Sequence, residues 1–394
     1  MTATGPVTAM SLPERAKRAA KVAAKYADAV DREGRFPSEA LKAMKAERLM
    51  GVMIKAELGG EGASLSEVAD VCVTLGQACG SSAMVYAMHQ IQIASLNDYA
   101  VGSAWHEIFL GRVCDEQLLI GSATSEAGGI GGNLRNSICA VDVVDDVVRL
   151  EKDATVISYG EAADAIMVTS RRNVEAAPSD QVSTVFVKGQ YTLEKTTGWD
   201  TIGMRGTCSE GFIFRAEGAK EQILPRPFAE IAAQSMLAVS HLLWSALWYG
   251  IAYDAFARGQ SFVKAAARKN PGQTPPGALR VAEAANLLQQ VKGNVVSGLK
   301  QFEAAKGNPD ALNAMSFAVA MNNIKIGTSQ TILTVINHCM LICGIAGYKN
   351  DTPYSLGRHL RDAHSAQLMI SNDRVLGNTS TMLLVNKPDP SLVG

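Results

Sequence analysis

Apolar positions in the first third of the chain recur with helical spacing. The segment Ser11–Glu14 has the spacing of a capping box, which predicts that an amphipathic helix begins there. Similar patterns predict a second helix over 36–49, a long helix over 64–96 and a short one over 104–110. The N-terminal part of the protein is therefore predicted to be helical.

Near Leu118 the pattern changes to short runs of β-branched and apolar residues. Residues 138–150 predict two strands around a turn at Asp145-Asp146, because Asp favours turns between apolar runs. Further strand-like runs cover 163–170, 183–188 and 211–215. Since no long helical pattern separates these runs, we expect a small antiparallel β domain.

Beyond Pro225 the helical pattern returns. The predicted helices cover 230–268, 279–305, 309–345 and 358–385. The whole chain is therefore predicted to have an α+β fold. We expect an N-terminal helical domain over 1–119, a middle β domain over 120–226 and a C-terminal helical domain over 227–394.

Composition favours extensive burial. Apolar residues make up 47% of the chain and charged residues 19%, against about 25% charged in an ordinary soluble protein. From Ile231 to Tyr253 there is no Asp, Glu, Lys or Arg, a run long enough to span a bilayer. Polar residues such as Gln234 and His241 interrupt it and no basic cluster flanks it, so we expect a core helix and no membrane span. The shortage of charge predicts that one helical face is buried between subunits.

The net charge of −1 gives no electrostatic argument for binding nucleic acid or an anionic membrane. The seven cysteines include no Cys-x-x-Cys pair. Cys339 and Cys343, one helical turn apart, are expected to pack in a core. With no secretory signal pattern at the N-terminus, these features predict a reducing, cytoplasmic location.

One segment is the first candidate for chemistry. Residues 122–133 read Ser-Ala-Thr-Ser-Glu-Ala-Gly-Gly-Ile-Gly-Gly-Asn. Small hydroxyls and free backbone N–H groups suit a flat ligand with carbonyl and ring-nitrogen acceptors. A tight turn between domains is the alternative. The chain has no Gly-x-Ser-x-Gly elbow, Walker A loop or His-Glu-x-x-His motif, which argues against those hydrolase, nucleotide and zinc chemistries.

Other segments extend this pattern. Residues 155–165 read Thr-Val-Ile-Ser-Tyr-Gly-Glu-Ala-Ala-Asp-Ala, and residues 203–209 read Gly-Met-Arg-Gly-Thr-Cys-Ser. Together with Gly-Ile-Ala-Gly-Tyr at 344–348 and Arg-His-Leu-Arg-Asp-Ala at 358–363, they resemble the motifs of the acyl-CoA dehydrogenase family of flavoproteins, in order and spacing. The resemblance implies a barrel-like middle β domain, a C-terminal four-helix bundle, FAD between the two, and a homotetramer.

The resemblance also implies a set of residues that contact FAD. Ser158 stands where the family's Thr bonds near flavin N5, whereas Val156 replaces the family's Trp. Arg268 would reach the pyrophosphate, and Gly344 and Gly347 would meet the FAD of a neighbouring subunit. The full predicted set is Ser122, Thr124, Ser125, Gly131, Val156, Ser158, Arg268, Gly344, Gly347, Asn372 and Arg374.

The family's usual catalytic base is missing. Acyl thioester dehydrogenation needs a carboxylate that removes an α-proton. By the resemblance, most members place this Glu at Ile370 and a minority place it near Ser240. Asp373, three residues after Ile370, is the replacement candidate, because positions i and i+3 share a helix face. An ion pair or a phosphate contact is the alternative role for this Asp.

Three functions remain open at this stage. The resemblance implies an FAD-dependent oxidoreductase that dehydrogenates an acyl-CoA and passes electrons to an electron-transferring flavoprotein. The alternative on the same fold is a reduced-flavin monooxygenase that hydroxylates N, S or C and receives its flavin from a flavin reductase. Such an enzyme needs no α-proton base and could use His89, His241 or His364. The third possibility is a helical scaffold without enzymatic activity.

Overall fold

The computed structural model describes residues 10–128 and 133–391. The N-terminal helices are α1 (Leu12–Glu33), α2 (Ser38–Ala46), α3 (Leu65–Ala78), α4 (Gly80–Tyr99) and α5 (Ala104–Glu116). The predicted capping box is confirmed, because the backbone N–H of Ser11 donates to the Glu14 carboxylate at 3.0 Å, at the start of α1.

The prediction of one continuous helix over 64–96 is wrong. Cys79 is extended (φ −156°, ψ 114°) and separates α3 from α4. The next residue, Gly80, packs so tightly that an added Cβ would lie 2.7 Å from the Asp362 carboxylate. Tertiary packing against a distant part of the chain therefore interrupts a helix that the hydrophobic pattern alone favours.

The middle region contains two sheets. Strands β1 (Ile120–Ala123), β4 (Ala165–Arg171) and β5 (Gln181–Val187) form one sheet in the order β1-β4-β5. Strands β2 (Asp142–Val144), β3 (Val147–Ser158), β6 (Tyr191–Thr197) and β7 (Ser209–Ala219) form the other in the order β2-β3-β7-β6. The predicted turn at Asp145, which has φ 55°, joins β2 and β3.

The antiparallel prediction fails for one strand pair. Strand β1 runs parallel to β4, with Ser122 opposite Met167, while the other pairs are antiparallel. Strand β1 follows α5 directly and joins the edge of β4, far away in the sequence. The sequence analysis missed β1 because it is short, and missed β6 because its side chains are mostly exposed and polar.

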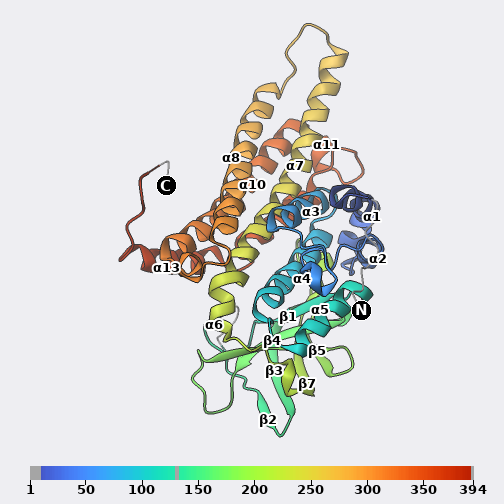
Figure 1. Cartoon of the computed structure of the whole chain (residues 1–394). Coiled ribbons are helices and arrows are strands. Elements are labelled where there is room, and N and C mark those ends of the chain that lie inside the picture. The colour runs from blue at the N-terminus through green and yellow to red at the C-terminus, as the bar shows by residue number, and fades with distance from the viewer. Residues whose placement is uncertain (1–9, 129–132, 392–394) are drawn as a thin grey trace.

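The C-terminal region is helical (Figure 1). Its helices are α6 (Phe228–Ile231), α7 (Leu237–Lys269), α8 (Ala278–Ala305), α9 (Pro309–Asn313), α10 (Met315–Cys343), α11 (Ile345–Tyr348), α12 (Gly357–Leu368) and α13 (Asn372–Leu383). The long helices α7, α8 and α10 lie side by side and extend away from the sheets. The predicted helices over 309–345 and 358–385 are each broken, at Ala314 and at 369–371.

The uncharged segment 231–253 forms a core helix, as predicted. The helical stretch Phe228–Lys269 is long and apolar enough to cross a membrane, yet 83% of its most apolar window is buried inside the protein. The stretch Met315–Cys343 passes the same test with 50% of its window buried. Core helices of soluble proteins have these properties, so neither helix is strong support for a membrane span.

The α+β class is confirmed, with helices first, sheets in the middle and helices last. The boundaries 1–119, 120–226 and 227–394 and the cytoplasmic location stay predictions.

Candidate functional site

A cavity of about 1190 Å³ lies where the sheets meet the helices. Its walls come from β1, the end of β3, α4, α7, α12 and the segment that joins β6 to β7. Ligand pockets commonly measure about 300–1,000 Å³, so this cavity has room for a ring-shaped cofactor with a small substrate.

Hydroxyl side chains line the strand side of the cavity. Ser122, Thr124, Ser125 and Ser158, four of the residues predicted to contact a flavin, all lie there. The Ser125 hydroxyl donates to the Val156 carbonyl oxygen at 2.9 Å and accepts from the Val156 N–H at 3.0 Å, which joins the loop after β1 to β3. The Ser122 and Thr124 hydroxyls make no hydrogen bond within the described residues, so both can bond a ligand.

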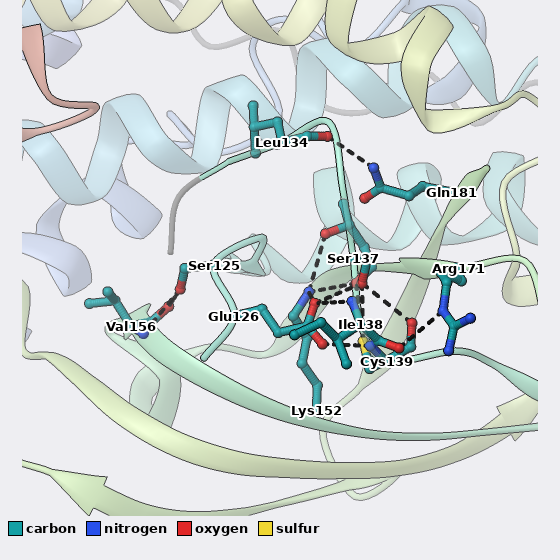
Figure 2. Close-up of polar contacts among 11 residues, drawn as sticks. Ser125, Glu126, Leu134, Ser137, Ile138, Cys139, Lys152, Val156, Arg171 and Gln181 are labelled. Atoms are coloured by element: carbon teal, nitrogen blue, oxygen red, sulfur yellow. Dashed lines mark hydrogen bonds and ion pairs between the residues drawn. The ribbon is translucent and has the colours of Figure 1, made fainter. Parts of the chain in front are cut away.

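The buried carboxylate of Glu126 anchors the loop after β1 through hydrogen bonds to residues 137–139 (Figure 2). Glu126 accepts hydrogen bonds from the Ser137 hydroxyl at 2.8 Å and from the backbone N–H groups of Ile138 at 3.0 Å and Cys139 at 2.6 Å. The Lys152 Nζ lies 3.9 Å from it. Burial raises the pKa of Glu126, but the Lys152 charge and the three hydrogen bonds lower it by a larger amount, so the net shift is downward. Glu126 is therefore an ionised structural group and does not line the cavity.

A chain of hydroxyl groups continues the strand wall. The Ser158 Oγ lies 2.8 Å from the Ser209 Oγ, which lies 2.8 Å from the Thr207 Oγ1. The Thr207 hydroxyl donates to the Met204 carbonyl oxygen at 2.9 Å. All three hydroxyl residues line the cavity. Only Ser158 was predicted; Thr207 and Ser209 lie within the quoted 203–209 segment but received no role.

Backbone strain is concentrated around this chain of hydroxyls. Tyr159, Met204 and Cys208 have φ values of 44°, 50° and 43°, in the left-handed region that non-glycine residues seldom adopt. Each such residue costs on the order of 1–3 kcal/mol and persists where the surroundings require it, often at a functional site. The strain supports the assignment of this wall to a ligand site.

Apolar side chains line the helical side. They are Met84, Met88 and Ile91 of α4, Met236 just before α7, Trp244 of α7, and Met369 after α12. His241, next to this wall on α7, has its pKa lowered to about 4 by burial and by the nearby Lys325 charge. It is therefore neutral at pH 7. His89 is bonded to Met50 and Ile120 and does not line the cavity, whereas His364 does.

Neither usual position of the dehydrogenase base carries an acid. Ser240 and Ile370 both line the cavity. The argument that Asp373 shares a helix face with Ile370 is wrong, because Ile370 has φ 46° and precedes α13. Asp373 is exposed and does not line the cavity.

The carboxylates that do line the cavity are paired with arginines. Asp28 lies 3.2 Å from Arg358 and Asp200 lies 2.9 Å from Arg205. Asp31 accepts two hydrogen bonds from the Arg361 guanidinium, one of them at 2.9 Å. Each of these carboxylates therefore already has a guanidinium partner, so none is a free carboxylate that could serve as a base toward a ligand in the cavity.

Several other residues that were predicted to contact FAD do not line the cavity. Arg268 is exposed at the end of α7, Gly344 precedes α11 and Gly347 lies within it, all outside the cavity lining. Arg374 is exposed on α13. Gly131 lies outside the described residues. One protein copy therefore does not bring Arg268, Gly344, Gly347 or Arg374 to the cavity lining.

Asn372 has a partner that the sequence analysis missed. The buried Lys325 of α10 donates to the Asn372 Oδ1 at 2.6 Å and to the Ile370 carbonyl oxygen at 2.8 Å. Burial lowers the pKa of Lys325 to about 8. The signal in the sequence that could have revealed this contact is that Lys325 is the single Lys in an apolar helical stretch. Its effect is to hold the left-handed residue Ile370 against the cavity.

Comparisons with known proteins agree with this geometry. Residues 12–117 match the N-terminal domain of acyl-CoA dehydrogenase. Butyryl-CoA dehydrogenase from Megasphaera elsdenii superimposes with a TM-score of 0.81 at 18% identity, over 96% of this chain and 100% of that one. These findings define the class: an α+β protein with the acyl-CoA dehydrogenase fold. The chain therefore shares the fold of this family and matches its N-terminal domain, while neither of the usual base positions carries a carboxylate.

Two further similar proteins are a nitrososynthase and a protein whose structure contains FMN. The amino sugar nitrososynthase DnmZ of Streptomyces peucetius is 24% identical over 352 residues, which cover 86% of this chain and 84% of that protein. The FMN-bound TdsC from Paenibacillus sp. A11-2 has a TM-score of 0.82 at 18% identity, over 97% of this chain and 100% of that one. A second structure of TdsC, a dibenzothiophene monooxygenase, superimposes with a TM-score of 0.80 at 17% identity.

Proposed function

We propose that this protein is a reduced-flavin-dependent monooxygenase with the acyl-CoA dehydrogenase fold. The observation that carries the proposal is the absence of a free carboxylate among the described residues that line the cavity. Ser240 and Ile370 occupy the usual base positions, and the lining aspartates are paired with arginines. Oxygen insertion at nitrogen, sulfur or an electron-rich carbon does not require removal of an α-proton.

The cavity residues fit a flavin ring. The unbonded hydroxyls of Ser122 and Thr124 match the polar edge of an isoalloxazine, and the opposite wall, with Met88 and Trp244, matches its apolar face. Bound reduced flavin supplies the electrons with which dioxygen delivers one oxygen atom to the substrate and the other to water. The chain itself binds the ring, keeps bulk water away with its apolar wall, and orients the polar edge through the strand wall.

The form of the flavin and the assembly are part of the proposal. The resemblance implies FAD, whereas the TdsC structure contains FMN; both share the same ring. Arg268, Gly344 and Gly347 lie outside the cavity, so they would touch FAD only from a neighbouring copy in a homotetramer. A flavin reductase is the partner that supplies reduced flavin.

Acyl-CoA dehydrogenation is the second candidate, favoured by the match of residues 12–117 and by the fold of butyryl-CoA dehydrogenase. It requires a base from outside the two usual positions, and Asp373 remains the candidate named from the sequence. Its electrons would pass to an electron-transferring flavoprotein. The exposed position of Asp373 outside the cavity counts against this function.

A pair of measurements separates the two functions. First, FAD or FMN bound to the protein is mixed with a panel of acyl-CoAs without oxygen, and the flavin absorbance is followed. Second, the protein receives flavin from a reductase and NADH in air, with an amine, a thioether or an aromatic heterocycle, and oxygenated product is measured by mass spectrometry. We expect no bleaching in the first experiment and oxygenated product in the second. Bleaching that slows about 10²–10⁴-fold in Asp373→Asn would instead establish the dehydrogenase.

A further inference from the structure

In the chain of hydroxyls from Ser158 to Thr207, the contacts determine which group donates each hydrogen bond and which accepts it. Its end is the Met204 carbonyl oxygen, which can only accept hydrogen bonds and lies 2.9 Å from the Thr207 Oγ1. The Thr207 hydroxyl has one proton, and this contact uses it. Ser209 must then donate to Thr207, and Ser158 must donate to Ser209, because each hydroxyl has a single proton.

The reverse direction is less favourable. If Thr207 donated to Ser209, its oxygen and the Met204 carbonyl oxygen would face each other at 2.9 Å as two acceptors. The protein would also lose one internal hydrogen bond. Thr207 and Ser209 are 3% and 6% exposed, so water cannot easily replace the lost bond. Ser158 therefore uses its proton inside the protein and presents only lone pairs to the cavity.

The backbone keeps this arrangement fixed. The Tyr159 N–H donates to the Thr207 carbonyl oxygen at 2.8 Å, which joins the end of β3 to the segment before β7. The Trp199 Nε1–H donates to the Met204 carbonyl oxygen at 3.1 Å and helps to hold it in place. The left-handed φ values of Met204 and Cys208 show that the fold maintains this turn against local preference.

We propose that this chain of hydroxyls makes Ser158 a hydrogen-bond acceptor toward the bound flavin, so that the site prefers reduced over oxidised flavin. Reduction adds N–H groups to the ring where the oxidised ring has bare nitrogen acceptors. An acceptor on the wall would form a hydrogen bond with an N–H group of the reduced ring, and it would repel the lone pair of the same nitrogen in the oxidised ring. The inference rests on the proposed function and deepens it, because a monooxygenase served by a separate reductase must capture the reduced form.

The test is the ratio of the dissociation constants of oxidised and reduced flavin. Binding of FMN and FAD is measured by fluorescence in air for the oxidised form and anaerobically after dithionite for the reduced form. We expect the wild type to bind reduced flavin more tightly. Thr207→Val removes the end of the chain and should lower the preference about fivefold, as expected for one hydrogen bond. Thr207→Ser keeps a hydroxyl at this position and should therefore retain the wild-type preference for reduced flavin.

Two further variants and a control complete the test. Ser209→Ala frees the Ser158 proton and should lower the preference as Thr207→Val does; Ser158→Ala should weaken binding of the reduced form alone. Thr197→Val is the control: its hydroxyl bonds the Gly211 N–H at 3.1 Å in the same sheet, outside the cavity lining. It should leave the ratio within about twofold of wild type, well below the effect of a hydrogen bond.

Unchanged ratios of the two dissociation constants in Thr207→Val and Ser209→Ala, with flavin still bound, would overturn this inference and leave the proposed function standing. Failure of the wild type to bind either form overturns the proposed function and the inference with it.

Discussion

On the strand side of the cavity, hydroxyl groups and a strained backbone face the interior, whereas on the helical side methionines and Trp244 form an apolar surface. The strand wall depends on hydrogen bonds that reach across the sequence, such as the bonds of Ser125 to Val156. The helical wall depends on side-chain packing of α4 and α7. The strand wall is therefore suited to orient a ligand, and the helical wall to exclude water from it.

The largest expected effect is on the support of the strand wall. Glu126→Ala would leave the buried Lys152 ammonium without its carboxylate partner and remove three hydrogen bonds. Removal of one partner of a buried ion pair costs about 3–5 kcal/mol, which urea unfolding would measure. Glu161→Ala is the control, because Glu161 is a largely exposed carboxylate 3.5 Å from Lys195. Equal losses in both variants would show that Glu126 gives the wall no special support.

The junction of the two walls can be disturbed by one methyl group. Gly203 lies against α12, and an added Cβ would be 2.1 Å from the Arg361 carbonyl oxygen. Because the obstacle is backbone, Gly203→Ala should reduce the free energy of unfolding by about 3 kcal/mol, at the upper end of the usual cost of overpacking. Gly198→Ala is the matched control, since nothing lies within 4 Å of its added Cβ. Thermal unfolding of both variants would measure the difference; similar melting temperatures would contradict the close approach.

The same junction should depend on pH. Asp362 accepts a hydrogen bond from the Met204 N–H at 2.7 Å, and burial raises its pKa from 3.8 to about 6. A carboxyl whose pKa is raised in the folded state stabilises the fold below pH 4, and this contribution is lost as the pH rises through 6. Asp362→Asn should therefore gain stability relative to wild type between pH 4 and 6, by about 2 kcal/mol. A difference in free energy of unfolding that does not change over this range would exclude the raised pKa.

The smallest effect on stability is expected at the unbonded hydroxyls. Ser122→Ala and Thr124→Val remove groups that bond nothing within the described residues, so unfolding should change by less than about 0.5 kcal/mol. Flavin affinity should nevertheless fall about five- to tenfold for each lost ligand hydrogen bond. Fluorescence titration would measure this, and unchanged affinity would remove these two residues from the flavin site.

The sequence by itself determined the fold class and much of the strand wall. Helical and strand periodicity gave the α-β-α order, and Ser122, Thr124, Ser125, Val156 and Ser158 lie together as expected. The hydroxyl- and glycine-rich segment 122–133 could be recognised from its local composition, whereas Val156 and Ser158 were named because their segment resembles a family motif.

The tertiary structure alone decided the breaks in the helices and the partners of the buried groups. Cys79 interrupts a periodic segment because Gly80 packs against Asp362, 282 residues later in the sequence. Ile370 leaves the helical conformation where Lys325 binds its carbonyl oxygen, and this separates Asp373 from the cavity. The direction of the hydroxyl chain likewise depends on one carbonyl group, that of Met204. Contacts between distant residues leave no periodic pattern in the sequence, so only the folded chain could reveal them.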